Sequence, residues 1–179
     1  MPYVQTDACQ AILYEPIHVI KLGVDLLTLD GIKMYGPRGM GLLYVRTGVV
    51  LHPLTFGGGQ QGGIRSGTEH VAGMVGLAYA LDIAESYREI ESERLMNIRD
   101  YGINKILETF PQATINGSRE NRLPNNINIC FPGIDAEFVV ISLDVVGISA
   151  SYSSACRTLK EDSSSYVIEA LGKKDCANS

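Results

Sequence analysis

The sequence predicts an α/β fold from three observations. Three short apolar segments in the first third, "YVQTDA", "DLLTLD" and "GLLYVR", have the length and composition of strands, and glycine- and proline-rich turns separate them. Apolar residues then recur at helical spacing over about forty residues. Beyond this stretch, strand-like and helix-like segments alternate. Strands that alternate with helices are typical of an α/β protein.

The composition is that of a globular protein. The chain has 179 residues, of which 45% are hydrophobic and 20% charged, which is enough for a substantial core. The net charge of −5 argues against nucleic acid or an anionic membrane as the main partner. The apolar stretches are too short to span a bilayer, and "MPYVQTDACQ" lacks the pattern of a signal peptide. A cytoplasmic location is therefore expected.

The first third contains the predicted strands 3–8, 25–30 and 41–46 and then a long glycine-rich segment. This segment, "PLTFGGGQQGGIRSGTEH" at 53–70, is too rich in glycine for regular structure and too long for a simple connection. Loops of this length in a compact chain are usually functional or disordered.

A helical stretch is predicted from Glu69 to Phe110. Its apolar stripe consists of Met74, Leu77, Ala78, Leu81, Ala84, Leu95, Ile98, Ile103, Ile106 and Phe110. The intervening "ESYREIESER", at 85–94, is almost entirely polar, and it indicates either a solvated helix face or a break in the helix.

The last third predicts shorter elements. The expected strands are 113–117, 125–132 and 147–151. The expected helices are 135–144, with Asp135 as its N-cap, and 165–172, closed by Gly172.

Lys33 is the first candidate for chemistry, in "LDGIKMYGPRGMGLLYVRTG" at 29–48. A lysine is a nucleophile only when neutral, which requires surroundings that lower its pKa. A lysine after a strand is more often an exposed structural residue. The glycines that follow permit tight turns and are weak evidence for a ligand by themselves.

The four cysteines show no zinc or dithiol spacing, and most are expected to be free thiols. Cys130 is predicted to be a buried strand residue. Cys156 lies in the serine-rich "SASYSSACRTLKEDSSS", beside Arg157 and Lys160, where a thiol pKa is lowered and the thiol is reactive. The alternative is an incidental loop thiol. None of the three histidines is spaced as a metal ligand, and no metal is expected.

Several motifs together resemble one family. Asp7-Ala8-Cys9-Gln10 is followed by Lys33 and then by "YGPRGMGLLYV"; "RSGT" stands at 65–68, and "SASYSSAC" ends at Cys156. This series is similar to that of the cysteine desulfurases, pyridoxal-phosphate (PLP) enzymes of the class V aminotransferase group, and it runs nearly from end to end. The resemblance implies part of a fold-type I PLP-transferase.

The resemblance also implies a domain division. Residues 1–68 would be the carboxyl-terminal part of the PLP-binding large domain. Residues 69–179 would be a long helical connection and most of the small α/β domain, truncated at its end.

The resemblance implies roles for five residues. Lys33 would carry the cofactor, Asp7 would salt-bridge its pyridinium nitrogen, and Gln10 would hydrogen-bond its phenolic oxygen. Thr68 would reach the phosphate of the partner subunit's cofactor, which implies a homodimer. Cys156 would take sulfur from L-cysteine as a persulfide.

The residues themselves leave simpler interpretations open. Asp7 is equally a residue type for an Asx turn, Gln10 for a surface amide and Arg65 for a surface ion pair.

The chain departs from the family pattern in two ways. Family members are about twice as long, with a substrate-binding arginine beyond the matched region. At the lysine motif, Asp30-Gly31-Ile32-Lys33 replaces S-x-[HS]-K, so phosphate binding should be weaker by about 1–3 kcal/mol per lost charged hydrogen bond. Weakened PLP binding and no activity of this chain alone are expected.

The leading functional prediction is a desulfurase that converts L-cysteine to L-alanine. Its sulfur would pass to an acceptor protein, such as an iron–sulfur scaffold, for iron–sulfur cluster or thio-cofactor biosynthesis. Two alternatives stay open: an enzyme like selenocysteine lyase, and a non-catalytic remnant that acts as a dimerisation or partner-binding domain.

Overall fold

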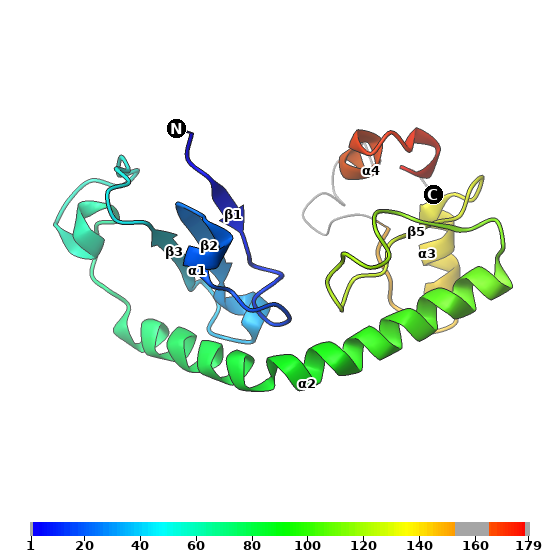
Figure 1. Cartoon of the computed structure of the whole chain (residues 1–179), viewed down its shortest axis with the longest axis horizontal. Helices are drawn as coiled ribbons and strands as arrows, with labels where there is room; N and C mark the ends of the chain where they lie inside the picture. Colours follow the sequence, from blue (N-terminus) through cyan, green and yellow to red (C-terminus); the bar gives the residue numbers. More distant parts are fainter. Residues whose placement is uncertain (1, 153–164, 178–179) are drawn as a thin grey trace. The chain divides into compact units, whose positions relative to one another are not determined.

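The structure, a computed structural model, describes residues 2–152 and 165–177 and has mixed helices and strands (Figure 1). The strands are β1 (Gln5–Asp7), β2 (Leu26–Asp30), β3 (Gly41–Val45), β4 (Thr114–Ile115) and β5 (Ile129–Cys130). The α-helices are α1 (Val19–Leu22), α2 (Val71–Thr109), α3 (Ala136–Val145) and α4 (Tyr166–Ala170). Three short 3-10 helices are η1 (Gly31–Met34), η2 (Gln60–Gly63) and η3 (Lys174–Cys176).

The chain divides into two compact units, Met1–Arg94 and Leu95–Ser179, and α2 continues from the first into the second. The division into domains at residues 68 and 69 stays a prediction. None of the described helices, α2 included, is long and apolar enough to cross a membrane.

The first unit contains a three-stranded sheet in the order β1-β2-β3, which confirms the three predicted strands. β1 is parallel to β2, with Asp7 opposite Thr28, and β3 is antiparallel to β2, with Gly41 opposite Asp30. Because β1 and β2 are parallel, the segments that follow Asp7 and Asp30 leave the sheet at the same edge.

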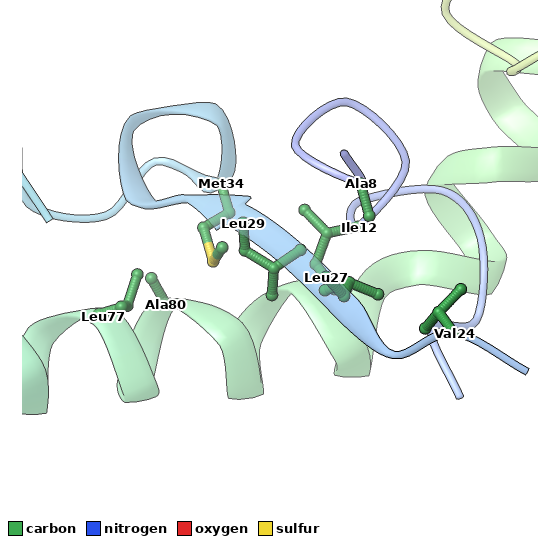
Figure 2. Packing of buried hydrophobic residues seen from close by; sticks show 8 residues of the cluster. All are labelled: Ala8, Ile12, Val24, Leu27, Leu29, Met34, Leu77 and Ala80. Carbon is green, nitrogen blue, oxygen red and sulfur yellow. The ribbon is translucent and has the colours of Figure 1, made fainter. Parts of the chain in front are cut away.

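The core of the first unit lies between this sheet and α2 (Figure 2). Residues of β2 alternate between half-buried and buried, and Leu27 and Leu29 are on the buried side. Met34, after β2, and Leu77 and Ala80, on α2, belong to the same cluster. Burying each leucine contributes about 1.5–3 kcal/mol relative to leaving it exposed, so this packing fixes the sheet on the helix.

The glycine-rich turn after η1 packs closely on α2. A Cβ atom added to Gly76 would lie 2.7 Å from Cγ of Pro37, and one added to Gly31 would lie 2.7 Å from the backbone oxygen of Met40. Both glycines are therefore required by close approach of the turn. They hold the segment between Lys33 and β3 against the helix.

The α2 helix is continuous over 39 residues, as its apolar spacing predicts. The polar stretch 85–94 does not break it. Arg88 pairs with Glu85, and Arg94 pairs with Glu91 at 2.6 Å. Such pairs three residues apart stabilise a solvated helix face, so the alternative of a helix break is wrong.

The second unit contains the antiparallel pair β4–β5 and the helices α3 and α4. Asp135 caps α3, with its Oδ1 accepting from the Phe138 N–H at 3.0 Å, as predicted. Gly172 follows α4 with a left-handed φ of 77°, also as predicted.

The strand expected at 147–151 is absent from the described residues. Instead, the Ile148 N–H donates to the carbonyl of Leu143 at 2.9 Å and completes the end of α3. In a strand this N–H would donate to a neighbouring strand, but here it already donates to a carbonyl at the end of α3.

The expectation that most cysteines are free thiols is wrong for one pair. Cys130 is fully buried in β5, as predicted, but it forms a disulfide with Cys176. The fold brings their Cα atoms to 5.3 Å, a separation usual for disulfides. Cys9 is free.

Candidate active site

The candidate residues Asp7, Gln10 and Lys33 all follow the carboxyl ends of parallel strands. Asp7 is the last residue of β1, Gln10 lies in the turn after it, and Lys33 lies in η1 directly after β2. All three are exposed. In α/β sheets this edge is the usual place for a ligand. The fold therefore brings a carboxylate, an amide and an amine to one edge of the sheet.

Asp7 is held by its own turn. Its Oδ1 accepts from the Cys9 N–H at 3.0 Å, which is the Asx-turn geometry that the sequence left open. Hydrogen bonds from the Cys9 side chain and backbone, and from Thr28, lower the pKa of the Asp7 carboxyl. Asp7 is thus ionised at neutral pH, as a partner of a pyridinium nitrogen has to be.

Thr28 is a site residue that the sequence analysis missed. It lies opposite Asp7 in the parallel register, and its carbonyl accepts from the Ala8 N–H at 3.0 Å. Pairing "YVQTDA" with "DLLTLD" in parallel is the signal that would have found it.

The surroundings of Cys9 favour its protonated thiol form. Burial raises its pKa to about 11, and the hydrogen bond and charge of Asp7 and the charge of Asp30 act in the same direction. Its Sγ lies 3.8 Å from the carbonyl oxygen of Thr28. A thiol with this pKa is a poor nucleophile at neutral pH.

Asp30 is turned toward the backbone next to Lys33. Its Oδ1 accepts from the Ile32 N–H at 3.2 Å, so Asp30 is the N-cap of η1. Aspartate and serine are both good N-caps. Asp30 can therefore replace the serine of the family pattern and still cap this turn. The carboxylate nevertheless keeps a negative charge three residues before Lys33.

Thr68 is exposed at the end of the glycine-rich segment 53–70. This segment contains η2 and an isolated bridge between Thr55 and Arg65, and Ser66 Oγ donates to the carbonyl of Thr55 at 2.8 Å. Arg65 donates to the Ser66 carbonyl at 2.5 Å. Thr68 lines a cavity of about 420 Å³ together with Gly39, Met40 and Gly41, the residues that lead into β3. The structure thus places Thr68 in the same unit as Lys33.

Cys156, the other predicted catalytic residue, lies outside the described residues, as do Arg157 and Lys160. Its role stays a prediction. Among the residues that the structure does describe, no three histidine, cysteine or acidic side chains are grouped to hold a metal ion.

The residues at the sheet edge fit PLP in type and charge. Lys33 would hold the cofactor covalently, Asp7 would pair with the ring nitrogen, and Gln10 would donate to the phenolic oxygen. PLP, when bound, supplies an electron sink. Ile32 offers no side-chain donor for the phosphate.

Comparison with known proteins identifies the family of this chain. The sequence matches the family Aminotransferase class-V over residues 2–167. The chain belongs to this family, whose members depend on PLP.

The curated relatives include a cysteine desulfurase IscS from Dictyoglomus turgidum, 44% identical over 154 residues, or 86% of this chain and 39% of that relative. A solved NifS-like protein superposes with a TM-score of 0.83 at 32% identity, over 98% of this chain and 45% of its own. Another, SspA in complex with cysteine, superposes with a TM-score of 0.70 at 30% identity, over 97% of this chain and 47% of its own.

These findings confirm the resemblance to cysteine desulfurases and the fold class predicted from the motifs. The chain spans about 40% of the length of the curated relatives it matches.

Proposed function

We propose that this chain is the carboxyl-terminal part of a PLP-dependent cysteine desulfurase. The observation that carries the proposal is the arrangement of Asp7, Gln10 and Lys33 at one edge of the sheet, in a chain related to proteins named cysteine desulfurases. In the net reaction, L-cysteine and the Cys156 thiol become L-alanine and a Cys156 persulfide, so atoms and electrons balance without a further reactant.

The roles of the residues in this proposal follow from their chemistry. Asp7, ionised at neutral pH, keeps the ring nitrogen protonated. Lys33 anchors the cofactor covalently. The solved relative in complex with cysteine supports L-cysteine as the substrate. Sulfur then passes from Cys156 to an acceptor protein, such as an iron–sulfur scaffold, in the cytoplasm.

We further propose a homodimer that forms through the glycine-rich segment. Leu54 and Phe56 in this segment are 95% and 84% exposed, so both side chains are available to pack against a second subunit. They lie on the same segment as Thr68, the residue proposed to reach the partner's cofactor. Replacing Leu54 and Phe56 with serine is expected to shift the protein from dimer to monomer in light scattering, whereas Val50→Ser, also at an exposed apolar residue, should not.

A chimera tests the proposed activity. The parts of the Dictyoglomus turgidum relative that precede and follow its matched region are fused to the two ends of this chain. Alanine and sulfide release from L-cysteine are then measured in dithiothreitol, which reduces the persulfide, with the intact relative as a positive control. We expect release by the chimera, and its loss in Lys33→Ala and Cys156→Ser. A chimera that binds PLP and yet releases neither product would refute the proposal.

A further inference from the structure

The Cys130–Cys176 disulfide joins two parts of the second unit that have little regular structure of their own. Cys130 is in β5, which pairs with β4 over two residues, and Cys176 ends η3, which is three residues long. Isolated elements of this length are not stable in water. The positions of β5 and η3 therefore depend on the disulfide and on the hydrogen bonds between the two parts.

The segment 165–177 is fastened to the β4–β5 pair at a second point. Lys173 Nζ donates to the carbonyl oxygen of Ile115 at 2.9 Å and to Oδ1 of Asn116 at 3.2 Å. Within the segment, the Ser165 N–H donates to the carbonyl of Ala177 at 3.0 Å, so its two ends are closed on each other. The disulfide is the covalent member of this set of contacts.

The two cysteines of the disulfide are unequally exposed. Cys130 has no exposed surface, whereas Cys176 is half-buried. A thiolate from solvent is therefore expected to reach Cys176, the more exposed cysteine, rather than Cys130. Reduction would then begin with attack on the Cys176 sulfur, and the Cys130 sulfur would be the leaving group.

We propose that Cys130–Cys176 is a redox-sensitive tether that holds the segment 165–177 on the β4–β5 pair. The thiolate of a small dithiol attacks Sγ of Cys176, the S–S bond breaks, and the Cys130 thiolate leaves and takes a proton. The second thiol of the reductant then displaces Cys176. The protein gains two electrons and two protons, the dithiol becomes a cyclic disulfide, and the segment keeps only its non-covalent contacts.

The tether has a consequence for sulfur transfer, which rests on the proposed function. Cys156 lies between Cys130 and Cys176 in the sequence, so the closed disulfide makes one covalent ring that contains the candidate nucleophile. Opening the ring removes the covalent anchor on the carboxyl-terminal side of Cys156. In this proposal the redox state of the pair decides only whether the chain between Cys130 and Cys176 forms a covalent ring. Disulfides in thiol-rich compartments are typically of this redox-sensing kind.

Hydrogen exchange of the full chain tests the tether. The protein is purified without reductant and compared with the same protein in dithiothreitol, and mass spectrometry follows exchange in peptides from 165–177. We expect exchange there to become roughly 30- to 1,000-fold faster on reduction, which corresponds to the usual stabilisation by a disulfide. Peptides from β1 to β3 should not respond and are the internal control.

Two variants sharpen this test. Cys176→Ser should exchange like the reduced protein and be insensitive to dithiothreitol, whereas Cys9→Ser, which removes the free cysteine, should respond like the wild type. Two alkylatable thiols at Cys130 and Cys176 before reduction, or equal exchange in both redox states, would overturn the proposal. Lys33→Ala should retain the full response, so loss of desulfurase activity and loss of the tether are separate outcomes.

Discussion

At the scale of single residues, Lys33 and Asp30 lie three positions apart but have different environments. The Asp30 carboxylate accepts a hydrogen bond from the Ile32 N–H, while the Lys33 side chain is exposed. An exposed amine reacts specifically with an aldehyde only if neighbouring groups hold the aldehyde in place. Asp7 and Gln10, which follow a strand end at the same edge of the sheet, are the residues proposed to do so.

Lys33 is expected to be the lysine that PLP modifies. Treating the chain with PLP and then borohydride should add one pyridoxyl group, and peptide mapping should find it on Lys33. Lys21, exposed in the same unit, is the matched control: Lys21→Ala should leave the labelling unchanged, and Lys33→Ala should abolish it. Labelling spread equally over the surface lysines would contradict the assignment.

Asp30 and Ile32 are expected to weaken the phosphate end of the PLP site. Asp30→Ser with Ile32→His should tighten PLP binding by about tenfold to a hundredfold, because donors replace a carboxylate and an apolar side chain. A spectroscopic titration measures this affinity. Asp30→Asn, which keeps the N-cap and removes only the charge, separates repulsion from lost donors. No gain in either variant would mean that Asp30 does not face the phosphate.

Cys9 is expected to resist alkylation until the solution is strongly alkaline. Burial and Asp7 raise its pKa to about 11 from 9.0, so its iodoacetamide rate should keep rising until about pH 11. The raised pKa also affects folding. The folded protein holds this proton more tightly, so the associated stability is fully present below pH 9.0 and is lost as the pH rises through about 11.

Asp7→Asn should shift the alkylation profile of Cys9 to lower pH, because a carboxylate that raises the pKa is removed. Mass spectrometry of the Cys9 peptide across a pH series measures both proteins. A wild-type midpoint near 9.0 would contradict the burial of this thiol.

At the scale of elements, α2 depends on two glycines in different ways. Gly76 faces Pro37, and an added Cβ would lie 2.7 Å from the proline Cγ, whereas a Cβ on Gly102 would meet Ile127 Cδ1 at 3.4 Å, an ordinary contact. Alanine favours a helix over glycine by about 1 kcal/mol, so the same substitution should have opposite effects at the two positions.

Gly76→Ala is expected to lower the free energy of unfolding by about 1–3 kcal/mol, since overpacking outweighs the helix preference. Gly102→Ala is expected to raise it by up to about 1 kcal/mol. Urea unfolding followed by circular dichroism measures both. Equal effects of the two substitutions would mean that the turn at Pro37 gives way and that the close approach is not required.

The elements that the sequence predicts well are those defined by local pattern. The three strands of the first sheet, the long α2 helix and the Asp135 cap each depend on periodicity or on a capping residue, and the structure confirms them. The strand expected at 147–151 has the right residues but lacks a partner, because Ile148 completes the end of α3. Pairing between distant segments is not encoded in either segment alone, and the Cys130–Cys176 disulfide was missed for this reason.

For the candidate site, the sequence motif names the residues, and their roles stay predictions. The motif places Asp7, Gln10 and Lys33, and the fold puts all three after carboxyl ends of parallel strands. Thr28 was missed because its contact with Asp7 depends on strand register, which single-segment patterns do not fix.

At the scale of the whole molecule, the two compact units each contain part of what the proposed reaction needs. The first holds the residues proposed for the cofactor, and the sequence of the second holds Cys156. Asp7, Gln10 and Lys33 are all open to solvent in this chain of 179 residues. Their electrostatic effect on a bound cofactor is weakened by water, and nothing among these three side chains orients a substrate carboxylate.

The purified chain of 179 residues is therefore expected to show no sustained sulfide release, although Cys156 is predicted to be reactive. Oriented binding supplies roughly 7–11 kcal/mol of the lowering of a reaction barrier, so a site that holds only part of the cofactor loses many orders of magnitude in rate. Reactivity of Cys156 depends on its thiolate, and the sequence predicts that the neighbouring Arg157 and Lys160 favour that form. Sulfide release is measured with L-cysteine, PLP and reductant, beside iodoacetamide mapping at neutral pH. Cys156 should alkylate faster than Cys9, whose pKa is about 11. Turnover that disappears in Cys156→Ser would show that these residues suffice for catalysis, and alkylation of Cys156 as slow as that of Cys9 would remove the case for it as the sulfur carrier.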